Sequence, residues 1–157
     1  MSIQKGSYFE PEITAFTCIY CGYMSADTAG ALRISYPPNV KLVKLPCTGK
    51  VDTRYILKAF EDGADGVYVV ACSLGNCHHV RGNERAYARV QWMKKLLDDI
   101  GLGGERLDMF FVSGGQGQAF ADAAKEMTER IRGLGPSPIN GSDKGKVTRD
   151  KGQGPNP

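Results

Sequence analysis

Residues 67–80 read Val-Tyr-Val-Val-Ala-Cys-Ser-Leu-Gly-Asn-Cys-His-His-Val. The first five are uncharged and rich in β-branched and aromatic side chains, which is typical of a parallel strand buried on both faces. Cys72 therefore stands where this strand ends, and a glycine-containing turn leads on to Cys77.

Two earlier segments repeat the pattern of an apolar run followed by a cysteine. Ile13–Thr17 runs into Cys18, and the run that starts at Val40 leads into Cys47. Because the carboxyl ends of parallel strands meet at one edge of a sheet, three predicted strands bring three thiols to the same edge.

Helical patterns separate these strands. We expect strands at about 13–17, 41–45, 67–71 and 106–112, and a helix of small residues at about 25–34 that Pro37-Pro38 ends. A second helix has Val51, Tyr55, Ile56 and Phe60 on one face and stops at Asp62-Gly63. A third is capped by Asn83 and buries Ala86, Val90, Met93, Leu97 and Ile100. A fourth buries Phe120, Ala124, Met127 and Ile131.

This alternation predicts the fold class. Strand and helix alternate four times, which is typical of an α/β protein with a flavodoxin-like open parallel sheet of about four strands and helices on both faces. In that order the first strand lies between the second and the third. Ligands bind beyond the carboxyl ends of such strands, where the five cysteines of the chain would converge.

The length and composition predict one folded domain and a tail. A chain of 157 residues with 41% hydrophobic content can bury a core without disulfides. We expect an α/β domain over residues 1–134 and a disordered tail rich in Gly, Pro and Lys over residues 135–157. The apolar runs are too short to span a bilayer, and Met1–Pro11 has no signal-peptide pattern, so we expect a cytoplasmic protein.

The charge distribution argues against nucleic acid as a partner. The formal net charge is +3, and the tail carries two of these three charges, because it holds four Lys or Arg and two Asp. The folded part is therefore nearly neutral and lacks the basic surface that nucleic-acid binding requires.

The five cysteines admit several interpretations. In a reducing compartment they are metal ligands, redox thiols or small buried residues rather than disulfides. Cys18 and Cys21 have the spacing of a dithiol redox pair, which leaves the other three unexplained. A structural zinc site would add His78 or His79 to the thiolates.

An iron–sulfur cluster accounts for more of the pattern than these alternatives do. Thiolates come from several loops, and Gly22, Gly49 and Gly75 stand beside them, where glycine lets backbone N–H groups approach sulfur. The odd count fits four ligands and one further thiol. Cys47, Cys72 and Cys77 are the firmest ligands, and one of Cys18 and Cys21 is the expected spare.

Several motifs resemble the iron–sulfur delta subunit of methyl-viologen-reducing (F420-non-reducing) hydrogenase. They cover about residues 16–134 and are Cys18-x-x-Cys21, Tyr36-Pro37-Pro38-Asn39, Cys47-Thr-Gly-Lys-Val-Asp52, Ala59-Phe-Glu-Asp-Gly-Ala-Asp-Gly-Val67 and Cys72-x4-Cys77-His78. The resemblance implies one [2Fe–2S] cluster, bound by four of Cys18, Cys21, Cys47, Cys72 and Cys77.

The same resemblance implies a role without a substrate of its own. Members of the family pass electrons from a hydrogenase, or a formate dehydrogenase, to the flavin-containing A subunit of heterodisulfide reductase in methanogenic energy metabolism, which involves electron bifurcation. A relay of this kind must dock with its partners near the cysteines. Tyr23, Lys50 and Arg81 are candidate docking residues there.

Overall fold

The computed structural model describes residues 9–140, and the first eight residues and the segment 141–157 of the expected tail lie outside the described part. Its strands are β1 (Ile13–Cys18), β2 (Val40–Leu45), β3 (Gly66–Cys72) and β4 (Leu107–Val112). Its α-helices are α1 (Cys21–Ala31), α2 (Thr53–Glu61), α3 (Gly82–Asp99) and α4 (Gly117–Leu134). Two short 3₁₀ turns, Thr48–Lys50 and Gly104–Arg106, precede α2 and β4.

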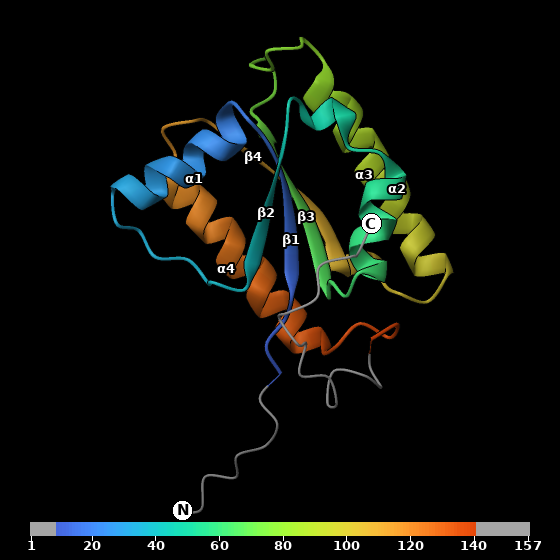
Figure 1. Ribbon diagram of the computed structural model, residues 1–157. Helices are drawn as coiled ribbons and strands as arrows, with labels where there is room; N and C mark the ends of the chain where they lie inside the picture. The colour runs from blue at the N-terminus through green and yellow to red at the C-terminus, as the bar shows by residue number, and fades with distance from the viewer. Residues whose placement is uncertain (1–8, 141–157) are drawn as a thin grey trace, which may run out of the picture.

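The described strands form one parallel sheet in the order β2-β1-β3-β4. Helices α1 and α4 cover one face and α2 and α3 cover the other, as Figure 1 shows. The predicted α/β class, the parallel sheet and the position of the first strand between the second and third are confirmed. β3 is buried along its whole length, which explains its uninterrupted apolar sequence.

The predicted helical faces are largely confirmed. Ala86, Val90, Met93 and Leu97 of α3 are fully buried, as are four residues of α4: Phe120, Ala124, Met127 and Ile131. Ile100 is an exception, because α3 ends at Asp99 and the Ile100 side chain is 59% exposed.

In α2 the predicted stripe is only partly correct. Ile56 and Phe60 are buried, but Tyr55 is 50% exposed because it lies one position away from their face. Val51 is buried yet precedes the helix, since the Asp52 carboxylate accepts a hydrogen bond from the backbone N–H of Arg54 and caps α2 there.

The predicted bounds of the first helix are wrong at both ends. α1 starts at Cys21 rather than residue 25, because Gly22 is buried against the sheet and takes part in the helix. It ends at Ala31, well before the two prolines, because Arg33 adopts a left-handed backbone (φ 56°) and the N–H of Ile34 bonds back to the carbonyl of Ala29.

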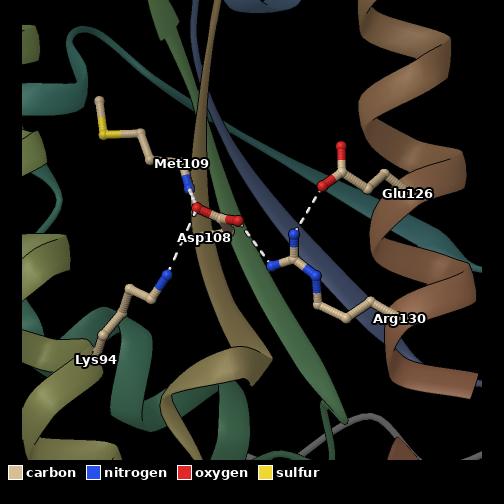
Figure 2. A network of polar contacts seen from close by, with 5 residues as sticks. All are labelled: Lys94, Asp108, Met109, Glu126 and Arg130. Atoms are coloured by element: carbon tan, nitrogen blue, oxygen red, sulfur yellow. Dashed lines mark hydrogen bonds and ion pairs between the residues drawn. The ribbon is translucent and has the colours of Figure 1, made fainter. Parts of the chain in front are cut away.

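Asp108 on edge strand β4 connects the two helical layers (Figure 2). Its carboxylate lies 2.7 Å from Arg130 of α4 and 3.8 Å from Lys94 of α3, and Arg130 also pairs with Glu126. Asp108 is near the amino end of β4, so this network supports the fold at the edge opposite the cysteines.

Buried charges hold both ends of the described chain at that same amino edge. Asp65 accepts hydrogen bonds from the backbone N–H groups of Glu12 and Ser137. Arg106, which is 5% exposed, donates to the carbonyls of Gly135 and Pro136. Residues 135–137, which the expected tail includes, therefore contact the core.

Candidate metal centre

The five thiols lie together at the carboxyl edge of the sheet, the upper end in Figure 1. Cys18 and Cys72 are the last residues of β1 and β3, and Cys47 follows β2 by two residues. Cys77 lies on the loop from β3 to α3. Cys21, expected on a loop, is instead the first residue of α1.

Four of the sulfur atoms form two close pairs. The Sγ atoms of Cys18 and Cys72 are 3.6 Å apart, and those of Cys47 and Cys77 are 3.9 Å apart. A tetrahedral metal with thiolates at about 2.3 Å holds two of them about 3.8 Å apart. Each pair thus has the spacing of two thiolates on one metal.

Electrostatic coupling links the two pairs and the fifth thiol. Cys21 forms a side-chain hydrogen bond with Cys72, and charge interactions link Cys21 to Cys77 and Cys47 to Cys72. All five thiols therefore occupy one site, in which Cys21 lies beside Cys72 of the first pair.

Backbone N–H groups point at the sulfur atoms. Gly22 donates to Cys18 at 3.1 Å, and Gly49 donates to Cys47 at 3.4 Å, as their sequence positions predict. The Sγ of Cys77 accepts from the N–H of His79 on the loop and from the N–H groups of Gly82 and Asn83, the first two residues of α3. Donors and the positive end of a helix dipole stabilise negative charge on thiolate sulfur.

The third glycine at the site is Gly82 rather than Gly75. A methyl group on Gly82 would overlap the Sγ of Cys47, and one on Gly49 would lie 2.9 Å from the Cα of Gly82. Gly75 has open space around it and a φ of +84°, so its role is to form the turn.

Burial and the N–H groups set the protonation of the free thiols. Burial raises the pKa of Cys18 to about 12, and it also raises the pKa of Cys21 and Cys47. Burial acts the same way on Cys77, but the backbone N–H groups outweigh it and lower the pKa of that thiol. The surroundings of Cys77 therefore favour the thiolate form of this cysteine.

The two histidines differ in their contacts. The imidazole of His78 stacks on the ring of Tyr20, and the His79 ring lies 6.4 Å from the same tyrosine at a tilt of 56°. Over residues 9–140, no three His, Cys, Asp or Glu side chains are arranged around a point that would hold a single metal ion.

The three candidate docking residues lie around the carboxyl edge of the sheet, and they differ in exposure and in the side chains they contact. Lys50 is exposed, and Arg81 pairs with Glu84 at 2.7 Å. The ring of Tyr23 lies 4.2 Å from the Nζ of Lys44.

The predicted helix cap Asn83 lies elsewhere than expected. The sequence predicts Asn83 as the residue that caps α3, but Asn83 is inside α3 and its side chain donates a hydrogen bond to the end of β3.

The fold and the site define a class: a parallel α/β domain whose strand ends and adjoining loops supply a cluster of thiols. The family described as methyl-viologen-reducing hydrogenase, delta subunit, matches residues 13–135, and the chain belongs to this family. Among the described residues, no helix is long and apolar enough to cross a membrane.

Similar proteins fall into two groups. The chain is 48% identical over 130 residues to the vhu iron–sulfur D subunit of F420-non-reducing hydrogenase from Methanococcus maripaludis, and equally similar to that from Methanocaldococcus jannaschii. Each match covers 83% of this chain and 97% of the relative. In the second group, the A subunit of Ferredoxin/F(420)H(2)-dependent CoB-CoM heterodisulfide reductase from Methanosarcina acetivorans is 35% identical over 126 residues, which cover 80% of this chain and 16% of the relative.

Proposed function

We propose that this protein is an electron-transfer subunit that carries one [2Fe–2S] cluster. The observation that carries the proposal is the arrangement of four sulfur atoms in two pairs, each spaced like two thiolates on one tetrahedral metal. Cys18 and Cys72 would hold one iron, Cys47 and Cys77 would hold the other, and Cys21 would be the fifth thiol.

The residues present fit such a cluster in charge as well as in spacing. Oxidised [2Fe–2S] with four thiolates carries a formal charge of about −2. The N–H groups of Gly22, Gly49 and the start of α3 already point at three of the four proposed ligand sulfurs. When bound, the cluster supplies one-electron transfer, and these donors stabilise its negative charge.

We further propose that the electrons come from a hydrogenase and go to the A subunit of heterodisulfide reductase. Relatives of this chain are named as hydrogenase iron–sulfur subunits, and a domain like it forms part of the A subunit of a heterodisulfide reductase. Two domains joined in one polypeptide in one organism are expected to bind each other as separate chains in another. A formate dehydrogenase is the alternative donor, and the setting is cytoplasmic, methanogenic and linked to electron bifurcation.

The cysteine edge is the proposed docking surface. Exposed apolar side chains surround it from three segments: Ile19 before α1, Met24 within α1, and Leu74 and Val80 on the loop to α3. Val80 is 77% exposed. Apolar side chains in the centre of an interface exclude water, which would bring the cluster and a partner's redox group close together.

Anaerobic purification tests the cluster proposal. The protein should be brown, contain two irons and two sulfides per chain, and give a paramagnetic signal after one-electron reduction. A colourless protein that contains zinc would support a zinc-stabilised adaptor, and metal-free protein with a reducible disulfide would support a dithiol redox protein. Either result would reject the proposed function.

A further inference from the structure

The side chain of Asn83 is buried between the end of β3 and the start of α3, where it forms three hydrogen bonds. Asn83 is the second residue of α3, and its side chain is completely buried. The side-chain Nδ2 donates to the carbonyls of Cys72 and Ser73 at 2.9 and 3.0 Å, and Oδ1 accepts from the N–H of Glu84. The side-chain amide thus joins the end of β3 to the start of α3.

The backbone of the same residue reaches the other thiol pair. A methyl group on Gly82, the residue before Asn83, would lie 3.2 Å from the Sγ of Cys77, which pairs with Cys47, and the N–H of Asn83 lowers the pKa of that thiol. Cys72, whose carbonyl the side chain holds, pairs with Cys18. Asn83 is therefore bonded to a cysteine of one pair and lies beside a cysteine of the other.

The loop between Cys72 and Asn83 is held mainly by turns within itself, in which the N–H groups of Asn76 and Val80 donate to the carbonyls of Ser73 and Cys77, and by the stack of His78 on Tyr20. Its residues Leu74 and Val80 are 63% and 77% exposed, and Val80 has a left-handed backbone with φ of 64°, which is unfavourable for a β-branched residue. A loop with this exposure does not hold Cys77 at a defined distance from Cys72 by packing.

We propose that Asn83 is a positioning residue that sets the separation of Cys72 and Cys77, and through them the separation of the two metal-binding thiol pairs. The inference rests on the proposed [2Fe–2S] site. It assigns to Asn83 a role beyond helix capping: Oδ1 satisfies the first-turn N–H of Glu84, but Asn83 lies inside α3 and its two donated hydrogen bonds go to the end of β3. Partners that orient metal ligands typically affect metal affinity by about 10–100-fold.

The test compares Asn83→Ala and Asn83→Asp with Asn76→Ala, an exposed asparagine on the same loop, which serves as the matched control. Asp retains the acceptor for Glu84 but loses both donors to β3. We expect both Asn83 variants to release iron to a chelator about tenfold faster or more, and any remaining cluster to show a changed midpoint potential and paramagnetic spectrum. Asn76→Ala should match the wild type.

Circular dichroism of the cluster-free variants separates positioning from folding. The proposal predicts that cluster-free Asn83→Ala keeps its secondary structure. It is overturned if the Asn83 variants hold the cluster with wild-type potential, spectrum and iron release, if both fail to fold without the cluster, or if Asn76→Ala changes as much as they do. If the wild-type protein itself contains no iron and sulfide, the proposed function is rejected, and this outcome is distinct from a failure of the Asn83 variants.

Discussion

The ring of Tyr20 lies parallel to the imidazole of His78, with centroids 3.7 Å apart and planes 13° apart. Tyr20 immediately precedes α1, and His78 follows Cys77 on the loop to α3. The stack therefore joins the segment between Cys18 and Cys21 to the loop that carries Cys77.

Removing this stack should expose the metal site to solvent. We expect Tyr20→Ala and His78→Ala each to accelerate bleaching of the cluster absorbance in air. The double variant should show less than the sum of the two effects, with a coupling of about 0.5–1.5 kcal/mol, as for other stacked ring pairs. Tyr55→Ala, at a half-exposed ring on α2, is the control. Additive effects would show that the stack does not act as a unit.

Five single Cys→Ser variants identify the ligands. Because Cys18, Cys72, Cys47 and Cys77 form the two close pairs, replacement of any of them should abolish or strongly perturb the cluster spectrum. Cys21→Ser should retain two irons and a wild-type spectrum. Retention by Cys18→Ser together with loss by Cys21→Ser would assign the ligands the other way and contradict the pairing.

Gly82→Ala should prevent cluster assembly, because its methyl group would overlap the Sγ of Cys47 and force the two loops apart. Iron content after anaerobic reconstitution measures this effect. Gly30→Ala is the matched control, since it lies within α1 with nothing near the new methyl. It should keep the iron and raise the free energy of unfolding by about 0.5–1 kcal/mol. Normal iron content in Gly82→Ala would contradict the observed contact.

In cluster-free protein, the thiols should react in a defined order. Only the thiolate reacts with iodoacetamide, and the lowered pKa of Cys77 means that this thiol becomes thiolate at lower pH than an ordinary cysteine. Burial raises the pKa of Cys18 to about 12, so that thiol stays protonated near neutral pH. Peptide mass spectrometry between pH 6 and about 9 should find Cys77 modified first and Cys18 last. The reverse order would show that the N–H groups do not point at Cys77.

Two truncations locate the end of the folded domain. A chain that ends at Asn140 should keep the thermal midpoint of the full-length protein. A chain that ends at Leu134 loses the carbonyls bonded to Arg106 and the N–H bonded to Asp65, both of which are buried. Its free energy of unfolding should fall by about 2 kcal/mol or more, measured by urea denaturation. Equal stability of the two chains would place the domain boundary at residue 134.

Local patterns in the amino-acid sequence are enough to predict the sheet and most of the buried helix faces. Apolar runs such as Val67–Ala71 and the three-and-four spacing of Ala86, Val90, Met93 and Leu97 are local patterns, and each specifies its own element whatever lies around it. The alternation of strand and helix then allows few topologies, so the gathering of strand-end cysteines at one edge could be predicted without coordinates.

The pairing of the thiols, and the polar groups that donate hydrogen bonds to them, depend on contacts between segments that are distant in the sequence. The partner of Cys18 is Cys72, 54 residues away, because β1 and β3 are neighbours in a fixed register. Gly82 rather than Gly75 approaches a sulfur atom, and the Asn83 side chain lies inside α3 and donates to the end of β3. These contacts depend on the position of α3 relative to the sheet, which the irregular loop between β3 and α3 sets. A loop has no periodic sequence pattern, so its path cannot be predicted from the sequence.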